Sequence, residues 1–442
     1  MSLIDTGRNM FKIPELKKRI IFTLIIIFIY RLGGHVPSPG VNPEVLRNFI
    51  AGHGGEGLFG LYDMFVGGNF SRFTVFALGI MPYISASIII QLMGTVFPHF
   101  HKLQREGAEG RKKLTQYTRY GTVIFGFIQA IGISIFISSV HDNGIPAVVP
   151  QMQGFLFMAT TAISLTTGTV IIMWLGEQIT SRGVGNGISL IICIGILAQL
   201  PVSVGVQVRQ VIADHGHVVI ALIFLAIVLV ATVAVVIMTQ AQRRIPIQTP
   251  KKVVGSKMYA GQNTVLPLRL NMAGVIPVIF ASSIMMFPSM IGSFLPVNDS
   301  PVLQDIFRLF EPGGILYSLI YGLLIIFFTY FYTAIQFNPT DIADNLKRQG
   351  GFIPGIRPGK NTAQFLDNVL TRITLPGSVF LALIAVGPMV LMRQFGGNFY
   401  FGGTSILIVV GVALDTLQQL ESHLQTRNYA GFMKKGSLRG RR

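Results

Sequence analysis

Long stretches without a charged residue constrain this chain more than any other feature. No Asp, Glu, Lys or Arg occurs in residues 74–97, 155–176, 218–238 or 315–337. Each of these runs is longer than the roughly 18 residues that mark a candidate membrane span. Charged residues make up only 12% of the 442 positions, well below the usual share in a soluble domain. The sequence therefore predicts an all-α integral membrane protein.

Hydropathy predicts ten transmembrane helices. We expect them at residues 20–37, 75–97, 119–138, 154–176, 185–200, 218–240, 273–296, 315–337, 373–392 and 400–420. The fifth is short and begins among glycines, at Gly185 and Gly187. The basic N-terminus and the apolar run after it also resemble a signal peptide. Further spans follow without a small-residue cleavage site, so we expect this segment to stay as the first helix.

Basic residues are concentrated in alternate connecting segments. Residues 1–19, 98–119, 177–183, 240–271, 338–372 and 421–442 hold 29 of the 35 Lys and Arg residues. The positive-inside rule places these segments and both termini in the cytoplasm, which requires an even number of spans. Much of the net charge of +17 is therefore a topology signal. Anionic lipid headgroups and nucleic-acid phosphates remain as partners for this charge.

Ten spans divide naturally into two sets of five. The long stretch at 201–217 separates an N-terminal half, residues 1–200, from a C-terminal half, residues 201–442. An odd number of spans in each half forces the second half to be inverted relative to the first. Inverted halves commonly place the functional site between them, near the membrane midplane.

Three connecting segments have unusual compositions. The segment 240–271 carries six basic residues and no acidic one, and 338–372 contains Arg357 between prolines and glycines. A rigid basic turn suits a docking surface, although an ordinary loop held near anionic lipid has the same composition. Residues 52–71 are too short to span and too apolar for a free loop. They predict a short packed helix with glycine hinges.

The usual signatures of membrane-embedded catalysis are missing from the sequence. It has no HExxH, GxSG or phosphate-loop motif, and its eight histidines show no metal-ligand spacing. The glycines at 183–187 lack the strand and acidic partner of a dinucleotide site. Cys193 lies in an apolar run and is expected to pack. We therefore expect no enzyme, no cofactor and no metal site.

The span interiors contain almost no ionisable residue, with Asp415 near the end of the last span and Arg393 just past the ninth. Ion-coupled carriers usually keep ionisable groups inside their spans, so this pattern disfavours such a carrier. A secondary transporter for a small polar solute remains an alternative.

One face of the second span combines isoleucines with polar groups. Ile80, Ile84, Ser87 and Gln91 share a helical stripe, and polar groups in hydrocarbon need a partner or water. The stripe should therefore face the protein interior. Similar spacings occur at Val275, Ile279, Ser282 and Met286, and at Ile188 and Ile192. Inward isoleucines predict a hydrophobic constriction, and ordinary helix packing is the alternative.

Several strings of this sequence closely resemble the bacterial SecY family. They are FALGIMPYISASIIIQL at 76–92, MWLGEQIT at 173–180, RGVGNGI at 182–188, NMAGVIP at 271–277, FNP at 337–339, ADNL at 343–346, PGIRPG at 354–359 and FGGTS at 401–405. The resemblance covers essentially the whole chain. It implies a clamshell of two inverted five-helix halves around an hourglass pore.

The resemblance also implies roles for particular residues. The pore ring would be Ile80, Ile84, Ile188, Ile192, Ile279 and Ile408. A plug would occupy about 58–71, including Leu58, Phe59, Leu61, Met64, Phe65, Val66, Gly67 and Gly68. A lateral gate between spans two and three and spans seven and eight would be lined by Ser87, Gln91, Ser282 and Ser283. A motor or ribosome would dock on Arg357, Arg243, Arg244, Lys251, Lys252 and Lys257.

The function implied by the resemblance is a protein-conducting channel in the bacterial cytoplasmic (inner) membrane. Such a channel passes unfolded secretory polypeptides and releases hydrophobic segments sideways into lipid. The implied partners are the SecE and SecG subunits, the SecA ATPase, the ribosome through its RNA, nascent polypeptides and membrane lipid.

Overall fold

The computed structural model describes residues 13–53, 58–142, 145–213, 217–249, 252–254, 257–259, 263–294, 314–395 and 402–435. Most of them are helical. The helices are α2 (Pro14–Gly33), α3 (Pro43–His53), α4 (Leu58–Val66), α5 (Met81–Val96), α6 (Pro98–Arg105), α7 (Ala108–Ser139), α8 (Phe155–Arg182), α9 (Gly187–Ala213), α10 (His217–Gln240), α11 (Ile276–Phe294), α13 (Ile315–Gln336), α14 (Pro339–Arg348), α15 (Lys360–Phe395) and α16 (Gly403–Lys435). A short 3-10 helix covers Pro150–Met152.

Each of the ten predicted spans coincides with a helix, namely α2, α5, α7, α8, α9, α10, α11, α13, α15 and α16. Among the described residues, seven of these are long and apolar enough to cross a membrane alone, and an eighth candidate is the pair of α5 and α6, bent by 104°. The charged turn at the start of α2 keeps this helix below that criterion.

Several span boundaries differ from the prediction. Helix α5 begins at Met81 because residues 75–80 form turns, with Gly79 at φ +57°. Helix α9 continues through Pro201 to Ala213, since a proline removes one backbone hydrogen bond without ending a helix that its neighbours support. The predicted division at 200/201 therefore lies inside α9.

The two long connecting segments are more ordered than the sequence predicted. In 240–271, strand β3 (Gln242–Gln248) pairs antiparallel with β6 (Asn263–Arg269), and β4 (Lys252–Val254) pairs with β5 (Lys257–Tyr259). In 338–372, α14 and the first turns of α15 replace most of the expected loop. The signal for β3 was the alternation in which Ile245 and Ile247 are buried between exposed neighbours.

A second, smaller core explains why this region folds. Residues of both segments and of α15 pack together, including Ile245, Leu268, Ile353, Leu366 and Leu370. The backbone of Gln248 also exchanges two 2.9 Å hydrogen bonds with Phe352. The two segments predicted as separate loops therefore form one unit.

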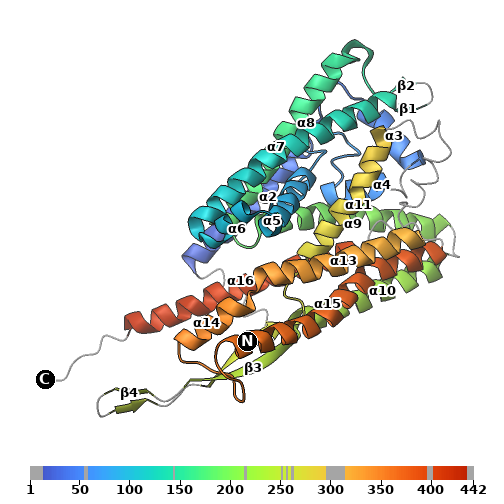
Figure 1. The fold of residues 1–442 in the computed structure, drawn as a ribbon. Coiled ribbons are helices and arrows are strands. Elements are labelled where there is room, and N and C mark those ends of the chain that lie inside the picture. Colours follow the sequence, from blue (N-terminus) through green and yellow to red (C-terminus); the bar gives the residue numbers. More distant parts are fainter. Residues whose placement is uncertain are drawn as a thin grey trace.

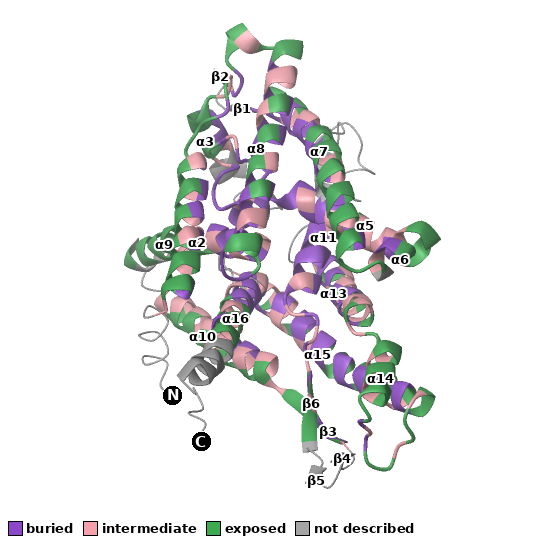
Figure 2. Ribbon diagram, turned by 90° about the vertical axis from the view of Figure 1, so that its left-hand side faces the viewer, coloured by how far each residue is buried: buried purple, intermediate pink, exposed green. Residues whose placement is uncertain are grey.

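The helices form two groups around the main core. In Figure 1, α2, α5, α7 and α8 lie together in blue and teal, and α13, α15 and α16 lie together in orange and red. Helix α11 contacts α5 and α7 of the first group as well as α13 and α16 of the second. Buried residues gather between the groups, while green exposed segments lie outside (Figure 2).

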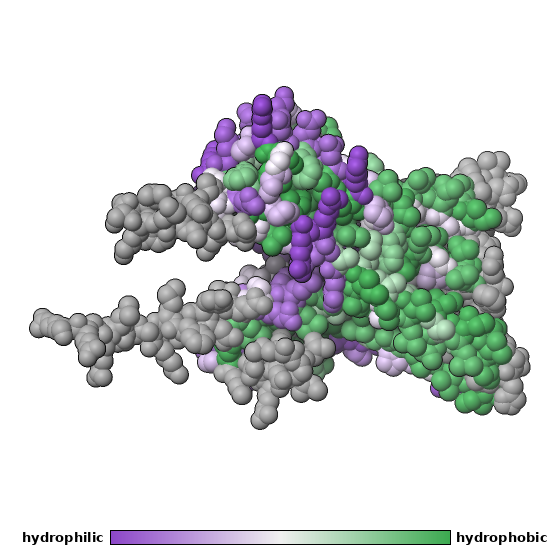
Figure 3. Space-filling view, turned by 90° about the horizontal axis from the view of Figure 1, so that it is seen from below, coloured by the Kyte–Doolittle hydropathy of each residue, from purple (hydrophilic) through white to green (hydrophobic). Residues whose placement is uncertain are grey.

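The two ends of the bundle carry different elements. Strands β3 and β6 lie at one end together with α14, and α3 with the short hairpin of β1 (His141–Asp142) and β2 (Ile145–Pro146) lies at the other (Figure 2). One face of the molecule shows hydrophilic side chains gathered toward one end and apolar side chains over most of the remainder (Figure 3). This distribution fits a bundle whose flanks contact lipid.

Candidate pore, gate and docking surface

The isoleucines singled out from the sequence belong to the main buried core. Ile80, Ile84, Ile192, Ile279 and Ile408 are each at most 5% exposed and lie in one cluster. They come from α9, α11, α16, α5 and the residue just before α5. Apolar side chains from helices of both groups therefore meet between them.

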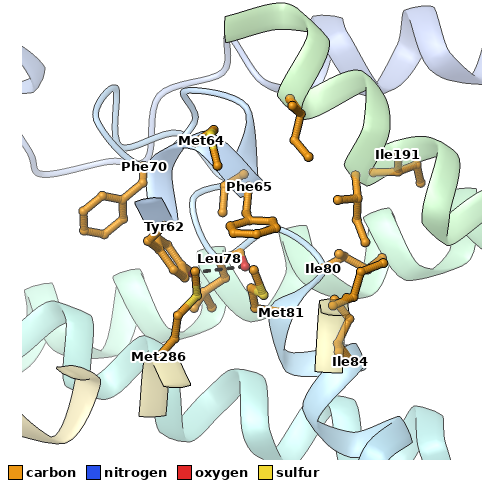
Figure 4. Close-up of a cluster of buried hydrophobic side chains, with 14 of the residues drawn as sticks. Tyr62, Met64, Phe65, Phe70, Leu78, Ile80, Met81, Ile84, Ile191 and Met286 are labelled. Carbon is orange, nitrogen blue, oxygen red and sulfur yellow. Dashed lines mark hydrogen bonds between the residues drawn. The ribbon is translucent and has the colours of Figure 1, made fainter. Parts of the chain in front are cut away.

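Ile188 lies at the edge of this cluster. It is partly buried and packs against the core. A Cβ added at Gly176 of α8 would lie 3.1 Å from Ile188 Cγ1, so this side chain also borders α8. Figure 4 shows Ile80 and Ile84 beside each other in one cluster, with Ile191 of α9 and Phe65 of α4 in the same cluster.

The short helix α4 is seated on this cluster. It packs against α9 and α11, and Met64 Sδ lies 3.1 Å from Ser405 Oγ of α16. Tyr62 donates a 3.1 Å hydrogen bond to the carbonyl of Leu78, which Figure 4 marks between the two residues. The predicted short packed helix is confirmed, and it contacts both groups of helices. The side chains of Leu58, Phe59 and Leu61 lie outside the described part of the structure.

The chain leaves α4 through a turn that glycine makes possible. Gly67 and Gly68 have φ of +77° and +80°, which is the left-handed region favoured by glycine. A Cβ at Gly67 would lie 2.8 Å from the Cα of Gly195 in α9, so α4 approaches α9 at backbone distance.

Asp63 then closes the turn after α4. Its Oδ1 accepts hydrogen bonds from the backbone N–H groups of Phe70 at 3.0 Å and Ser71 at 2.9 Å. Burial raises the pKa of Asp63, although these two donors and Arg72 act in the opposite direction. The carboxylate therefore ties the short helix to the segment that follows it.

The seam between α11 and the pair α5 and α7 joins the two groups of helices; we call it the gate seam. Ser283 Oγ on α11 lies 3.7 Å from Met81 Sδ on α5. The hydroxyls of Ser282 and Ser283 both donate to the carbonyl of Ile279, at 2.8 Å. Polar groups at this seam are thus satisfied largely within their own helix.

The polar residues of α5 follow the same pattern. Gln91 Nε2 donates to Ser87 Oγ at 3.0 Å, one turn earlier on the same helix. Both side chains are half-buried. The sequence placed these two residues on one stripe, and the structure confirms that they lie together.

The basic residues expected to dock a partner lie on the ordered unit described above. Arg243 and Arg244 are exposed on β3, and Arg357 is exposed in the turn between Gly355 and Gly359. The Arg357 carbonyl accepts a 2.9 Å hydrogen bond from Thr362 Oγ1, which fixes the turn on the start of α15. Lys251 lies outside the described residues, as do the side chains of Lys252 and Lys257.

The sequence did not reveal the contacts that cross between the groups. Met81 with Ser283 and Met64 with Ser405 pair a thioether with a hydroxyl across 202 and 341 positions of sequence. Neither residue type signals such a contact, because methionine and serine are common in any span. Within the described residues, no group of three or more His, Cys, Asp or Glu side chains could hold a metal ion.

Comparison with known proteins gives a consistent result. The SecY family model matches residues 74–417. The protein translocase subunit SecY of Thermotoga maritima is 43% identical over 439 residues, which covers 98% of this chain and 99% of the relative. The same subunit from Streptomyces galbus is 46% identical, with coverage of 96% and 98%. That of Escherichia coli K12 is 44% identical, with coverage of 96% for both chains.

Solved structures share the fold at lower sequence identity. A protein-conducting channel superposes with a TM-score of 0.62 at 17% identity, covering 96% of this chain and 97% of the other. Sec61 in a canine ribosome–channel complex from the endoplasmic reticulum gives a TM-score of 0.60 at 16% identity, with the same coverage. At this level of identity the likeness concerns the arrangement of the helices.

Proposed function

Because the chain belongs to the SecY family, we propose that it conducts unfolded secretory polypeptides through the isoleucine cluster and releases apolar segments sideways through the gate seam. The chain is a multi-pass protein-conducting channel subunit and not an enzyme. The observation that carries the proposed route is the packing of α4 against α9 and α11, within the buried cluster that also holds isoleucines from both groups of helices. A removable helix above an apolar constriction is what a channel for chains of varied sequence requires.

In the proposed mechanism, Ile80, Ile84, Ile188, Ile192, Ile279 and Ile408 form a ring around the moving polypeptide. Branched apolar side chains exclude water and ions while they deform around a threaded chain. Helix α4 and the residues up to Ser71 act as the plug that leaves the ring when the channel opens. The halves that separate are α2 to α9 and α10 to α16, so that their boundary follows Ala213 and not the predicted 200/201.

Sorting at the gate needs no catalytic group. Each central leucine favours lipid by roughly 0.5 kcal/mol, and one lysine or aspartate opposes entry by about 3 kcal/mol. A sufficiently apolar segment therefore leaves between α5 and α11, past Ser87, Gln91, Ser282 and Ser283. A polar segment continues along the pore.

The driving energy comes from a partner that binds the unit of β3 to β6, α14 and the 352–359 turn. We assign SecA or the ribosome to this surface, with phosphates of ribosomal RNA as counter-charges for Arg243 and Arg244. SecE and SecG complete the complex. The positive-inside rule gives both termini a cytoplasmic location in the bacterial cytoplasmic membrane.

Ion conductance tests the ring. Ile84→Ser should raise the conductance of the resting channel in planar bilayers, because a hydroxyl replaces a branched apolar group at the constriction. Ile89→Ser is the matched control, since Ile89 lies on the same helix and is 37% exposed. Equal conductance of the two variants would remove the sealing role from Ile84.

A charge reversal tests the docking turn. Arg357→Glu should abolish SecA-driven transport of a precursor into proteoliposomes and leave the amount of membrane-inserted channel unchanged. Arg47→Glu makes the same charge change at an exposed position of α3, at the opposite end of the bundle, and should retain transport. Transport by the Arg357 variant at the wild-type rate would show that the motor docks elsewhere.

A further inference from the structure

The glycine-rich string between α8 and α9 has no role in the function described so far. We call residues 182–187, with the sequence RGVGNG, the glycine turn. The turn brings α8 and α9 into close contact. A Cβ at Gly187 would collide with the carbonyl oxygen of Gly176, and one at Gly183 would lie 2.7 Å from the carbonyl oxygen of Ile179. Gly185 has φ +84°. Close approach therefore requires glycine at 183 and 187, and the positive φ favours glycine at 185.

Hydrogen bonds fix the turn to its own half of the molecule. The Val184 N–H donates to Thr23 Oγ1 of α2 at 3.1 Å, and Arg19 Nη1 donates to the Gly183 carbonyl at 3.3 Å. Thr180 Oγ1 accepts from the Gly187 N–H at 2.9 Å. These bonds join the turn to α2 and α8.

The same turn also contacts the other half. The Gly185 N–H donates to Gln419 Oε1 of α16 at 3.1 Å, and a Cβ at Gly185 would lie 3.1 Å from Thr416 Oγ1. Val184 packs in a small buried cluster with Leu16 of α2 and Leu420 of α16. We call this contact between the glycine turn and α16 the glycine-turn seam.

Separation of the glycine-turn seam would be costly. It would uncover the apolar cluster and remove the partner of the buried Gly185 N–H. The gate seam has no comparable backbone bond among the described contacts, because its serines are satisfied within α11. The two seams between the halves are thus chemically unlike.

We propose that the glycine-turn seam is a fulcrum, a contact that stays made while the gate seam separates. This inference rests on the proposed opening of the two halves. It also gives α16 two roles along its length. Its buried residue Ile408 belongs to the constriction, while Gln419 and Leu420, about three turns further along, hold the helix to the first half. Movement at the ring is then a rotation about a fixed end of α16.

Paired cysteines test the fulcrum in the full chain, in a Cys193→Ser background that removes the only native thiol. One variant carries Val184→Cys with Leu420→Cys across the glycine-turn seam. The matched variant carries Met81→Cys with Ser283→Cys across the gate seam. Both are reconstituted with their translocase partners, bridged with a short thiol crosslinker and assayed for transport of a secretory precursor. Leu16→Cys with Leu420→Cys provides a second fulcrum pair.

A fulcrum predicts that bridging 184 with 420 leaves transport at the unbridged rate, whereas bridging 81 with 283 stops it. Bridging yield is the second measurement. With a precursor trapped in the channel, the 184/420 yield should stay at its resting level and the 81/283 yield should fall. Loss of transport, or a lower yield, for the 184/420 pair would overturn the fulcrum. Transport through a channel bridged at 81/283 would refute the opening of the halves itself, and the fulcrum with it.

Discussion

The two seams between the halves of this channel use different chemistry for the same task of joining helices. At the gate seam, α11 meets α5 and α7 through buried apolar side chains and one hydroxyl–thioether contact. At the glycine-turn seam, a backbone N–H of the first half binds a side chain of the second, above a small apolar cluster. When the polar side chains at a seam bond within their own helix, the two helices can separate without leaving a polar group unpaired.

This difference indicates which contact can open. Separation of the gate seam exposes apolar surface to lipid or to an apolar polypeptide segment, which replaces one apolar neighbour by another. Separation of the glycine-turn seam exchanges the Gly185 N–H bond to Gln419 for one to water, a net loss of about 0.5–1.5 kcal/mol, and it also exposes the apolar side chains of Val184, Leu16 and Leu420 to water. The contrast can be tested at both seams with matched substitutions.

The largest contrast concerns access to a signal sequence. Cysteines at Ser87 and Ser282 should each crosslink to a trapped apolar signal segment, because both residues belong to the helices that flank the exit into lipid. Leu420→Cys on the glycine-turn seam should give no product. The measurement is the yield of crosslinked precursor on a gel. A product at Leu420, with none at Ser87 or Ser282, would place the exit at the other seam.

The next largest effect concerns the free energy of unfolding, which should respond to an added side chain in the glycine turn. Gly187→Ala should destabilise the channel by about 3 kcal/mol, because the new methyl group collides with the backbone of Gly176 and the backbone cannot yield. Thermal unfolding of the purified complex measures this loss. Gly205→Ala is the matched control on the same helix, where an added Cβ has no atom within 4 Å. It should be neutral or stabilising by up to about 1 kcal/mol. Equal midpoints for the two variants would show that the turn tolerates a side chain.

Hydropathy and charge predicted the ten helices because burial in lipid acts on every residue of a span in the same direction. They failed where tertiary packing decides the outcome. The start of α15 at Lys360 depends on Leu366 and Leu370 packing against Leu268 of β6. Such a contact, between residues about 100 positions apart, leaves no periodic signal in either segment alone.

The residues of the pore and the gate were also predictable only in part. The isoleucine spacing located Ile80, Ile84 and Ile279 in the buried core, since a helical stripe is a local property. The seam contacts of Met81 with Ser283 and of Gly185 with Gln419 were not predictable. They depend on how two halves distant in sequence are placed relative to each other. The glycines at 183–187 were visible in the sequence, and only the fold shows which helix they contact.

The smallest expected effect compares one hydrogen-bonding side chain at each seam. Ser283→Ala removes a hydroxyl that donates to the Ile279 carbonyl of its own helix. The backbone hydrogen bonds of α11 do not depend on this hydroxyl. We expect a loss of at most about 0.5 kcal/mol in thermal unfolding, since a side chain that bonds back to its own helix adds little to helix stability. Gln419→Leu removes the acceptor of the buried Gly185 N–H across the glycine-turn seam and should cost about 1–3 kcal/mol. If Ser283→Ala were the more damaging change, the gate seam would be the stronger attachment, and the halves could not open there while the glycine turn holds.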